Sequence, residues 1–241
     1  LSTPSQPQAF AQRQWSVKLR PMSLVHPTPV TFKGPAGTLE GLYGPPEAPE
    51  GTVAPPAAAA ILCHPHPAHG GTMHNTVVYR AAKALRRAGM AVLRFNFRGV
   101  EGSEGTHHGT GLEEEDAAAA LDYLAERHPG LPLWAGGFSF GARTVSGLAP
   151  RDARIQRCLL IALPVSVFEC KPIVDVRQPS YLLFAGNDDF GTSAALRQGF
   201  PGLGPNLEVD EIPGTDHFFR HKTPELEARI HAWAERSLDA S

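Results

Sequence analysis

The sequence predicts an α/β fold: a mostly parallel sheet of eight strands with helices on both faces. The main observation is that short β-branched or Leu-rich runs alternate, from Val30 onward, with Ala- and charge-rich amphipathic stretches, as in βαβ units. The second is size, because 241 residues that are 42% hydrophobic can fill one large core. The third is that no internal repeat or change of composition divides residues 25–241, which we expect to form a single domain.

The chain before this domain has a different character. Residues 1–24 are rich in Gln, Pro and Ser, and they show neither hydrophobic periodicity nor the apolar core of a signal peptide. We expect them to be an irregular N-terminal extension.

Each predicted strand is a short apolar or alternating run, and each predicted helix has an apolar face. The expected strands are Val30–Lys33, Leu39–Tyr43, Ala58–His64, Ala91–Phe97, Leu133–Gly136, Arg157–Leu163, Tyr181–Ala185 and Leu207–Ile212. The expected helices are Thr76–Ala88, Glu113–Glu126, Phe140–Leu148, Ser193–Gln198 and Pro224–Leu238. No helix separates the first two strands, so they are expected to form an antiparallel entry to the sheet.

Charge and hydropathy exclude several function classes. Lys and Arg number 22 against 24 Asp and Glu, a net charge of −2 without a basic stripe, so nucleic acid is not an expected partner. The longest apolar run, Ala57–Cys63, is far shorter than the ~20 residues that span a bilayer, so no membrane association is expected. Three cysteines (Cys63, Cys158 and Cys170) are an odd number, and two lie in predicted core strands, which favours a reducing, cytoplasmic location over a disulfide framework.

The strongest chemical signal is a G-x-S-x-G motif centred on Ser139. Gly137 and Gly141 flank the serine, the apolar run Leu133–Ala135 precedes the motif, and a helical stretch follows it. A turn this tight between strand and helix leaves no room for side chains at the flanking positions, and it raises the serine onto the carboxyl edge of the sheet. The context predicts that Ser139 is a nucleophile.

A serine hydroxyl needs a base, and a base needs an orienting acid, in the chain order Ser, Asp, His. His217 follows the last predicted strand and precedes the terminal helix, so it is the expected base. Two adjacent aspartates follow the strand Tyr181–Ala185. The spacing Gly-x-x-Asp from Gly186 favours Asp189 as the acid, and Asp188 is the alternative.

Acyl transfer also requires two N–H groups that bind the developing oxyanion. Phe140, directly after the nucleophile, is expected to supply one. The second is expected from the loop after the third strand, where prolines at positions 65 and 67 have no N–H and His66 is the best donor.

The same loop suggests an alternative chemistry. His64, His66 and His69 have a spacing reminiscent of metallo-hydrolases, although Ala68 stands where such sites carry an aspartate. No distant His or Asp set completes a metal site, so we expect neither a metal nor a cofactor. His107 is interpreted as a polar loop residue, and the acidic run at 113–116 as the first turn of a helix, where the helix dipole favours anions, rather than as a metal site.

Four segments together resemble the α/β-hydrolase superfamily, and within it the small bacterial hydrolases related to dienelactone hydrolase. They are HPHPAHGGTMHN at 64–75, RFNFRG at 94–99, GFSFG at 137–141 and TDHFF at 215–219. The resemblance covers about residues 30–238, and it implies a Ser139, Asp189 and His217 triad with Phe140 and His66 at the oxyanion. Glu101 replaces a glycine usual in that group, and the acid loop is one residue short.

The residues thus predict a cofactor-free serine hydrolase. Because the nucleophile is Ser139 and not the cysteine of dienelactone hydrolase, a carboxylesterase acting on small or short-acyl esters is favoured. Only 17 residues, 164–180, separate the strands between which many relatives insert a lid, so no large lid is expected. The alternatives are a metal-dependent hydrolase built on His64, His66 and His69, and a non-catalytic binding protein with this fold.

Overall fold

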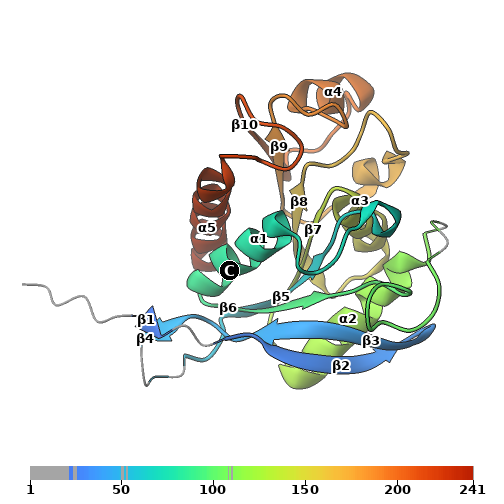
Figure 1. Cartoon of the computed structure of the whole chain (residues 1–241). Helices are drawn as coiled ribbons and strands as arrows, with labels where there is room; N and C mark the ends of the chain where they lie inside the picture. The colour runs from blue at the N-terminus through green and yellow to red at the C-terminus, as the bar shows by residue number, and fades with distance from the viewer. Residues whose placement is uncertain are drawn as a thin grey trace, which may run out of the picture.

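The computed structural model of the chain describes residues 22–23, 26–49, 52, 54–107, 109 and 111–240. A twisted eight-stranded sheet runs through its centre in the order β10-β9-β8-β7-β5-β6-β3-β2 (Figure 1). The strands from β5 to β10 pair in parallel, and β3 pairs antiparallel with both β2 and β6. The bounds are β2 (Thr28–Gly34), β3 (Gly37–Gly44), β5 (Ala58–Cys63), β6 (Met90–Phe95), β7 (Leu133–Phe138), β8 (Ile155–Ile161), β9 (Ser180–Ala185) and β10 (Leu207–Ile212). The predicted mostly parallel sheet with an antiparallel entry is confirmed.

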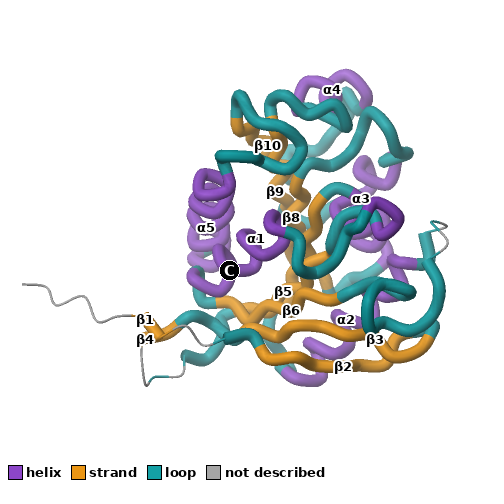
Figure 2. The backbone as a smooth tube through the Cα atoms, viewed as in Figure 1, coloured by secondary structure: helices purple, strands orange, loops and turns teal. Residues whose placement is uncertain are grey.

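Helices cover both faces of the sheet, as expected (Figure 2). They are α1 (Thr76–Arg87), α2 (Glu113–Arg127), α3 (Phe140–Leu148), α4 (Ser193–Gly199) and α5 (Thr223–Asp239). Helices α1 and α5 pack side by side on one apolar core, and α2 and α3 pack against the core on the opposite face. Two cores separated by one sheet explain why the central strands are apolar on both sides.

Strand β5 shows how the sequence produces this arrangement. All six of its residues are buried. Ala59, Ile61 and Cys63 face the core of α2 and α3, whereas the residues between them face the core of α1 and α5. The edge strand β2 instead mixes exposed and buried positions, because one of its faces meets solvent. Continuous apolar runs therefore mark the centre of the sheet, and an alternating run marks its edge.

The structure differs from the predicted elements in a few places. Most of the expected N-terminal extension lies outside the described residues, but β1 (Met22–Ser23) pairs antiparallel with β4 (Ala48–Pro49) as a small separate ribbon that the sequence did not predict. Strands β6 and β8 also end two residues early. At β8 the cause is Ala162, whose φ of 47° turns the chain out of the extended conformation.

The connection between β8 and β9 decides how open the molecule is. It contains only one short 3-10 helix, η3 (Lys171–Asp175), so the structure has no lid in this part, as predicted. All three cysteines are free and buried, and burial raises the pKa of the Cys158 thiol to about 12 and that of Cys170 to about 11. Among the described helices, none has both the length and the apolar character needed to cross a bilayer.

Candidate active site

Ser139 lies at the tight turn between β7 and α3. Its φ of 56° and ψ of −116° fall outside the regions that L-residues ordinarily occupy, as a strained nucleophile turn requires. The flanking glycines are sterically necessary. A Cβ on Gly141 would lie 2.3 Å from the carbonyl oxygen of Cys63, and one on Gly137 would lie 2.3 Å from the carbonyl carbon of Gly141. The G-x-S-x-G spacing is therefore dictated by close backbone contact.

A continuous series of hydrogen bonds links this serine to a histidine and an aspartate. Ser139 Oγ is 2.9 Å from Nε2 of His217, and Nδ1 of His217 is 2.7 Å from Oδ2 of Asp188. All three residues are buried. With an ionised Asp188, Nδ1 donates to the carboxylate, and the unprotonated Nε2 accepts from the serine hydroxyl. This arrangement lets the imidazole take the serine proton.

The acid beside His217 is Asp188 and not Asp189, so the choice based on Gly-x-x-Asp spacing is wrong for this contact. The Asp188 side chain is buried, and its Oδ1 accepts from the backbone N–H of Phe190 at 2.8 Å, whereas Asp189 is exposed. The backbone N–H of Asn187 also donates to the carbonyl of Thr215 at 2.9 Å. These bonds fix the short loop after β9 so that residue 188 faces the histidine loop.

His217 is held by its own loop between β10 and α5. The aromatic rings of Phe138, Phe190 and Phe218 surround its imidazole, with centroids 4.6–5.3 Å away. The loop bends through Phe219, whose φ is 53° and whose N–H donates to the carbonyl of Asp216 at 2.8 Å. The predicted position of the histidine at the carboxyl edge is therefore observed.

Two backbone N–H groups lie near the nucleophile without acceptors among the described residues: those of Phe140 and His66. Phe140 begins α3, and the first N–H groups of a helix have no partner within the helix. The N–H of Ser139 itself donates to the carbonyl of Ile161 and is not available. The rings of His66 and Phe140 lie 4.8 Å apart, which brings the loop after β5 against the start of α3.

That loop folds back on itself, and two features allow it to do so. A Cβ on Gly71 would lie 2.0 Å from the carbonyl oxygen of Pro65, so only glycine fits there. Nδ1 of His66 accepts from the N–H of Ala68 at 3.2 Å, capping the short helix η1 (Pro67–His69). The second oxyanion donor expected from the sequence thus lies on a compact, sterically constrained loop.

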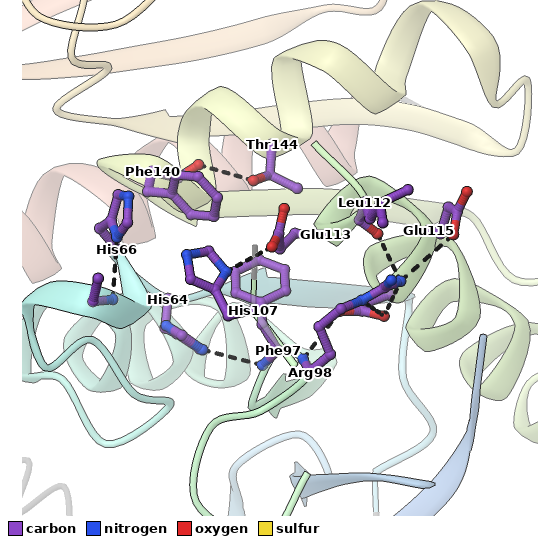
Figure 3. Close-up of polar contacts among 12 residues, drawn as sticks. His64, His66, Phe97, Arg98, His107, Leu112, Glu113, Glu115, Phe140 and Thr144 are labelled. Carbon is purple, nitrogen blue, oxygen red and sulfur yellow. Dashed lines mark hydrogen bonds and ion pairs between the residues drawn. The ribbon is translucent and has the colours of Figure 1, made fainter. Parts of the chain in front are cut away.

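His64 has a structural role that the sequence did not reveal (Figure 3). Its ring is fully buried, with Nδ1 2.7 Å from the carbonyl of Pro65 and Nε2 accepting from the N–H of Phe97 at 3.1 Å. Burial lowers the pKa of His64 to about 4, so the ring is neutral. Because both ring nitrogens are engaged, His64 has no lone pair for a metal, which removes one ligand of the proposed His64, His66 and His69 site. The described residues contain no group of three or more His, Cys, Asp or Glu side chains placed to hold a metal ion.

A second histidine packs behind the loop that follows β5. Nδ1 of His107 is 2.6 Å from Oε1 of Glu113, and the His107 ring lies 5.2 Å from that of His66 and 5.8 Å from that of Phe140 (Figure 3). Glu113 is buried, and its Oε2 has no partner among the described residues. The acidic run at 113–116 forms the first turn of α2, as predicted, and Glu113 is a buried member of that turn. Asp116 of the same turn is buried against the guanidinium of Arg98.

The cleft above Ser139 is small, with a volume of about 190 Å³. Its rim carries three exposed apolar side chains, Val167, Phe190 and Phe218. Among the described residues that line it, none is acidic. A serine, a buried histidine–aspartate pair and an open apolar cleft at the carboxyl edge of this sheet define an α/β serine hydrolase without a lid.

Comparisons with known proteins identify the family. The family model described as serine aminopeptidase, S33, matches residues 57–200, and the chain belongs to this family of α/β hydrolases. Over 214 residues the chain is 36% identical to the uncharacterized protein RP471 of Rickettsia prowazekii, covering 84% of this chain and 86% of that one.

Solved structures agree. XC6422 from Xanthomonas campestris, described as an α/β serine hydrolase without lid, is 31% identical with a TM-score of 0.80, and the match covers 92% of this chain and 99% of that one. The Pyrococcus furiosus esterase Pf2001, at 16% identity, a TM-score of 0.70 and coverage of 87% and 92%, shares the fold.

Proposed function

We propose that the chain is a carboxylesterase that cleaves small or short-acyl esters through an acyl-Ser139 intermediate. The observation that carries this proposal is the hydrogen-bonded series Ser139–His217–Asp188 beneath a small, open cleft. Asp188 is thus proposed as the acid in place of Asp189. The backbone N–H groups of Phe140 and His66 are proposed as the oxyanion donors.

The geometry supports a two-step reaction. Ser139 Oγ attacks the ester carbonyl carbon while its proton passes to Nε2 of His217, and the carbonyl oxygen becomes an oxyanion facing the two N–H groups. When the tetrahedral intermediate collapses, the C–O bond to the alcohol breaks and the imidazolium returns its proton to the leaving oxygen. Water then repeats the sequence on the acyl-enzyme, giving the carboxylic acid and free Ser139.

The cleft favours short acyl chains. Its volume of about 190 Å³ is below the roughly 300–1,000 Å³ typical of sites for drug-sized ligands. The apolar rim gives a small acyl or alcohol group somewhere to pack. An aminopeptidase would need an anion for the substrate's α-ammonium group, and the absence of a carboxylate among the described lining residues favours an ester over a peptide.

The test uses a fluorophosphonate probe followed by p-nitrophenyl esters of graded acyl length. We expect stoichiometric labelling of the purified chain, none in Ser139→Ala, and the highest kcat/KM for acyl groups of two to about six carbons. Activity that survives Ser139→Ala but is abolished by a chelator would support the metal-dependent alternative instead. Absence of both labelling and turnover would support a binding protein.

A further inference from the structure

A second cavity, of about 120 Å³, lies between helix α1 and strands β3 and β6, and its described lining shares no residue with the cleft over Ser139. The cations Lys83, Arg86 and Arg94 line it, together with one acid, Glu47. Its remaining walls include apolar side chains, among them Leu42, Ala82 and Val92. The esterase mechanism uses none of these residues.

Arg94 is the unusual member of this lining. It belongs to β6, its residue is only 6% exposed, and no carboxylate of the described residues lies within ion-pair distance of it. Nη1 donates to the carbonyl of Met73 at 2.8 Å, and the guanidinium lies 5.6 Å from the ring centre of Tyr79. A guanidinium has five N–H donors and stays charged at neutral pH, so one carbonyl leaves most of its donors unused. None of the Arg94 nitrogens is a fully buried atom without a partner, so the donors that no protein acceptor uses are open to a molecule in the cavity.

The surroundings increase the positive charge. Arg86 is also buried; its Nε donates to the carbonyl of Pro45 at 2.7 Å, and its Nη1 lies 3.9 Å from Oε1 of Glu47. Lys83 contacts Glu227, but Arg80 and Arg87 contact the same carboxylate. Burial lowers the pKa of Arg94, Tyr79 opposes that shift, and the neighbouring Arg86 adds to it.

The sequence just before the residues that line the cavity adds no acidic side chain. His26 and Pro27 line the cavity, and residues 1–25, which precede them, contain no Asp or Glu.

We propose that this cavity binds a small oxyanion, a phosphate or a carboxylate group, on the guanidinium of Arg94. The cavity volume equals that of about four liquid waters, which suits one such group with little attached to it. Planar, bidentate donors are what arginine offers to both phosphate and carboxylate. The apolar walls formed by Leu42 and Val92 leave room for the short chain of a small carboxylic acid.

The experiment is a calorimetric titration of the full chain with inorganic phosphate and, separately, with butyrate, at constant ionic strength so that screening does not change. We expect saturable binding of at least one anion, and which of the two binds more tightly tells phosphate from carboxylate recognition. Arg94→Met should weaken that binding at least tenfold. Arg236→Met, which removes an exposed arginine paired with Glu208, is the matched control and should change affinity less than twofold.

A second variant keeps the test decisive if Arg94→Met does not fold. Ala82→Met, from helix α1, places extra volume in the cavity without changing any charge. It should abolish anion binding while labelling of Ser139 by fluorophosphonate stays unchanged. An anion bound beside Ser139 would be insensitive to this change. Absence of saturable binding by the unmodified chain, or full affinity in Ala82→Met, would overturn the proposal.

Discussion

The two adjacent aspartates make the sharpest test of the proposed mechanism. In Asp188→Asn the amide oxygen is expected to keep the bond that Oδ1 now accepts from the N–H of Phe190 at 2.8 Å. The amide NH₂ must then face Nδ1 of His217, where Oδ2 now lies 2.7 Å away. A donor at this position requires Nδ1 to be unprotonated, so the proton moves to Nε2, and Nε2 can no longer accept the proton of Ser139.

The expected fall in kcat follows from losing both the reactive tautomer of His217 and the negative charge of Asp188. The same change in the serine-protease template lowers kcat by about 10⁴, equivalent to about 5.5 kcal/mol in activation free energy. Here the aspartate side chain has no exposed surface, so water cannot take its place. Asp189 is exposed, and Asp189→Asn should change kcat less than about threefold and stability by less than about 0.5 kcal/mol.

The assay compares kcat for one activated short-chain ester in the two variants and the unmodified chain, after equal thermal unfolding midpoints have been verified. A low kcat in Asp188→Asn with normal kcat in Asp189→Asn supports the geometry. If Asp189→Asn is instead the inactive variant, or if both retain activity, the orientation of His217 by Asp188 is refuted.

Three further predictions concern the packing around the site. Burial in the folded chain lowers the pKa of His64 from 6.5 to about 4, so the unfolded chain binds an extra proton between these pH values. The free energy of unfolding should therefore fall by about 3 kcal/mol on acidification from pH 6.5 to 4. Urea titrations of His64→Asn should lack this part of the dependence of unfolding free energy on pH, and an equal dependence in both proteins would contradict the prediction. Gly141→Ala should lower the free energy of unfolding by about 1–3 kcal/mol, because the added Cβ would meet the Cys63 carbonyl. Gly199→Ala is the control, because a Cβ at that position meets no atom within 4 Å, and it should leave the free energy of unfolding unchanged. Similar unfolding midpoints for the two variants would refute the steric argument. His107→Ala leaves Glu113 buried without a partner and should lower the free energy of unfolding by about 1–3 kcal/mol. Adding Glu113→Gln to this variant should restore part of the loss, because it removes the buried charge. A double variant no more stable than His107→Ala would exclude this coupling.

Much of the architecture is determined by local sequence. Each central strand is a continuous apolar run because it is buried on both faces, and each helix shows its own periodicity, so β5 or α3 can be recognised without knowing its neighbours. The nucleophile turn is equally local. Ser139 is identified by glycines two residues away, and those glycines are required by backbone contacts at the turn and with the end of β5. His217 is found because chain order places it after the last strand.

Tertiary structure alone decided which polar groups meet. Asp188 and Asp189 are chemically identical neighbours, and the bonds of Asn187 to Thr215 and of Phe190 to Asp188 select which one faces His217. The roles of His64 and Glu113 were likewise invisible, because their partners come from loops that are distant in the sequence. Periodicity reports the burial of a segment, whereas the direction of one buried polar side chain depends on hydrogen bonds that exist only once separate loops have packed together.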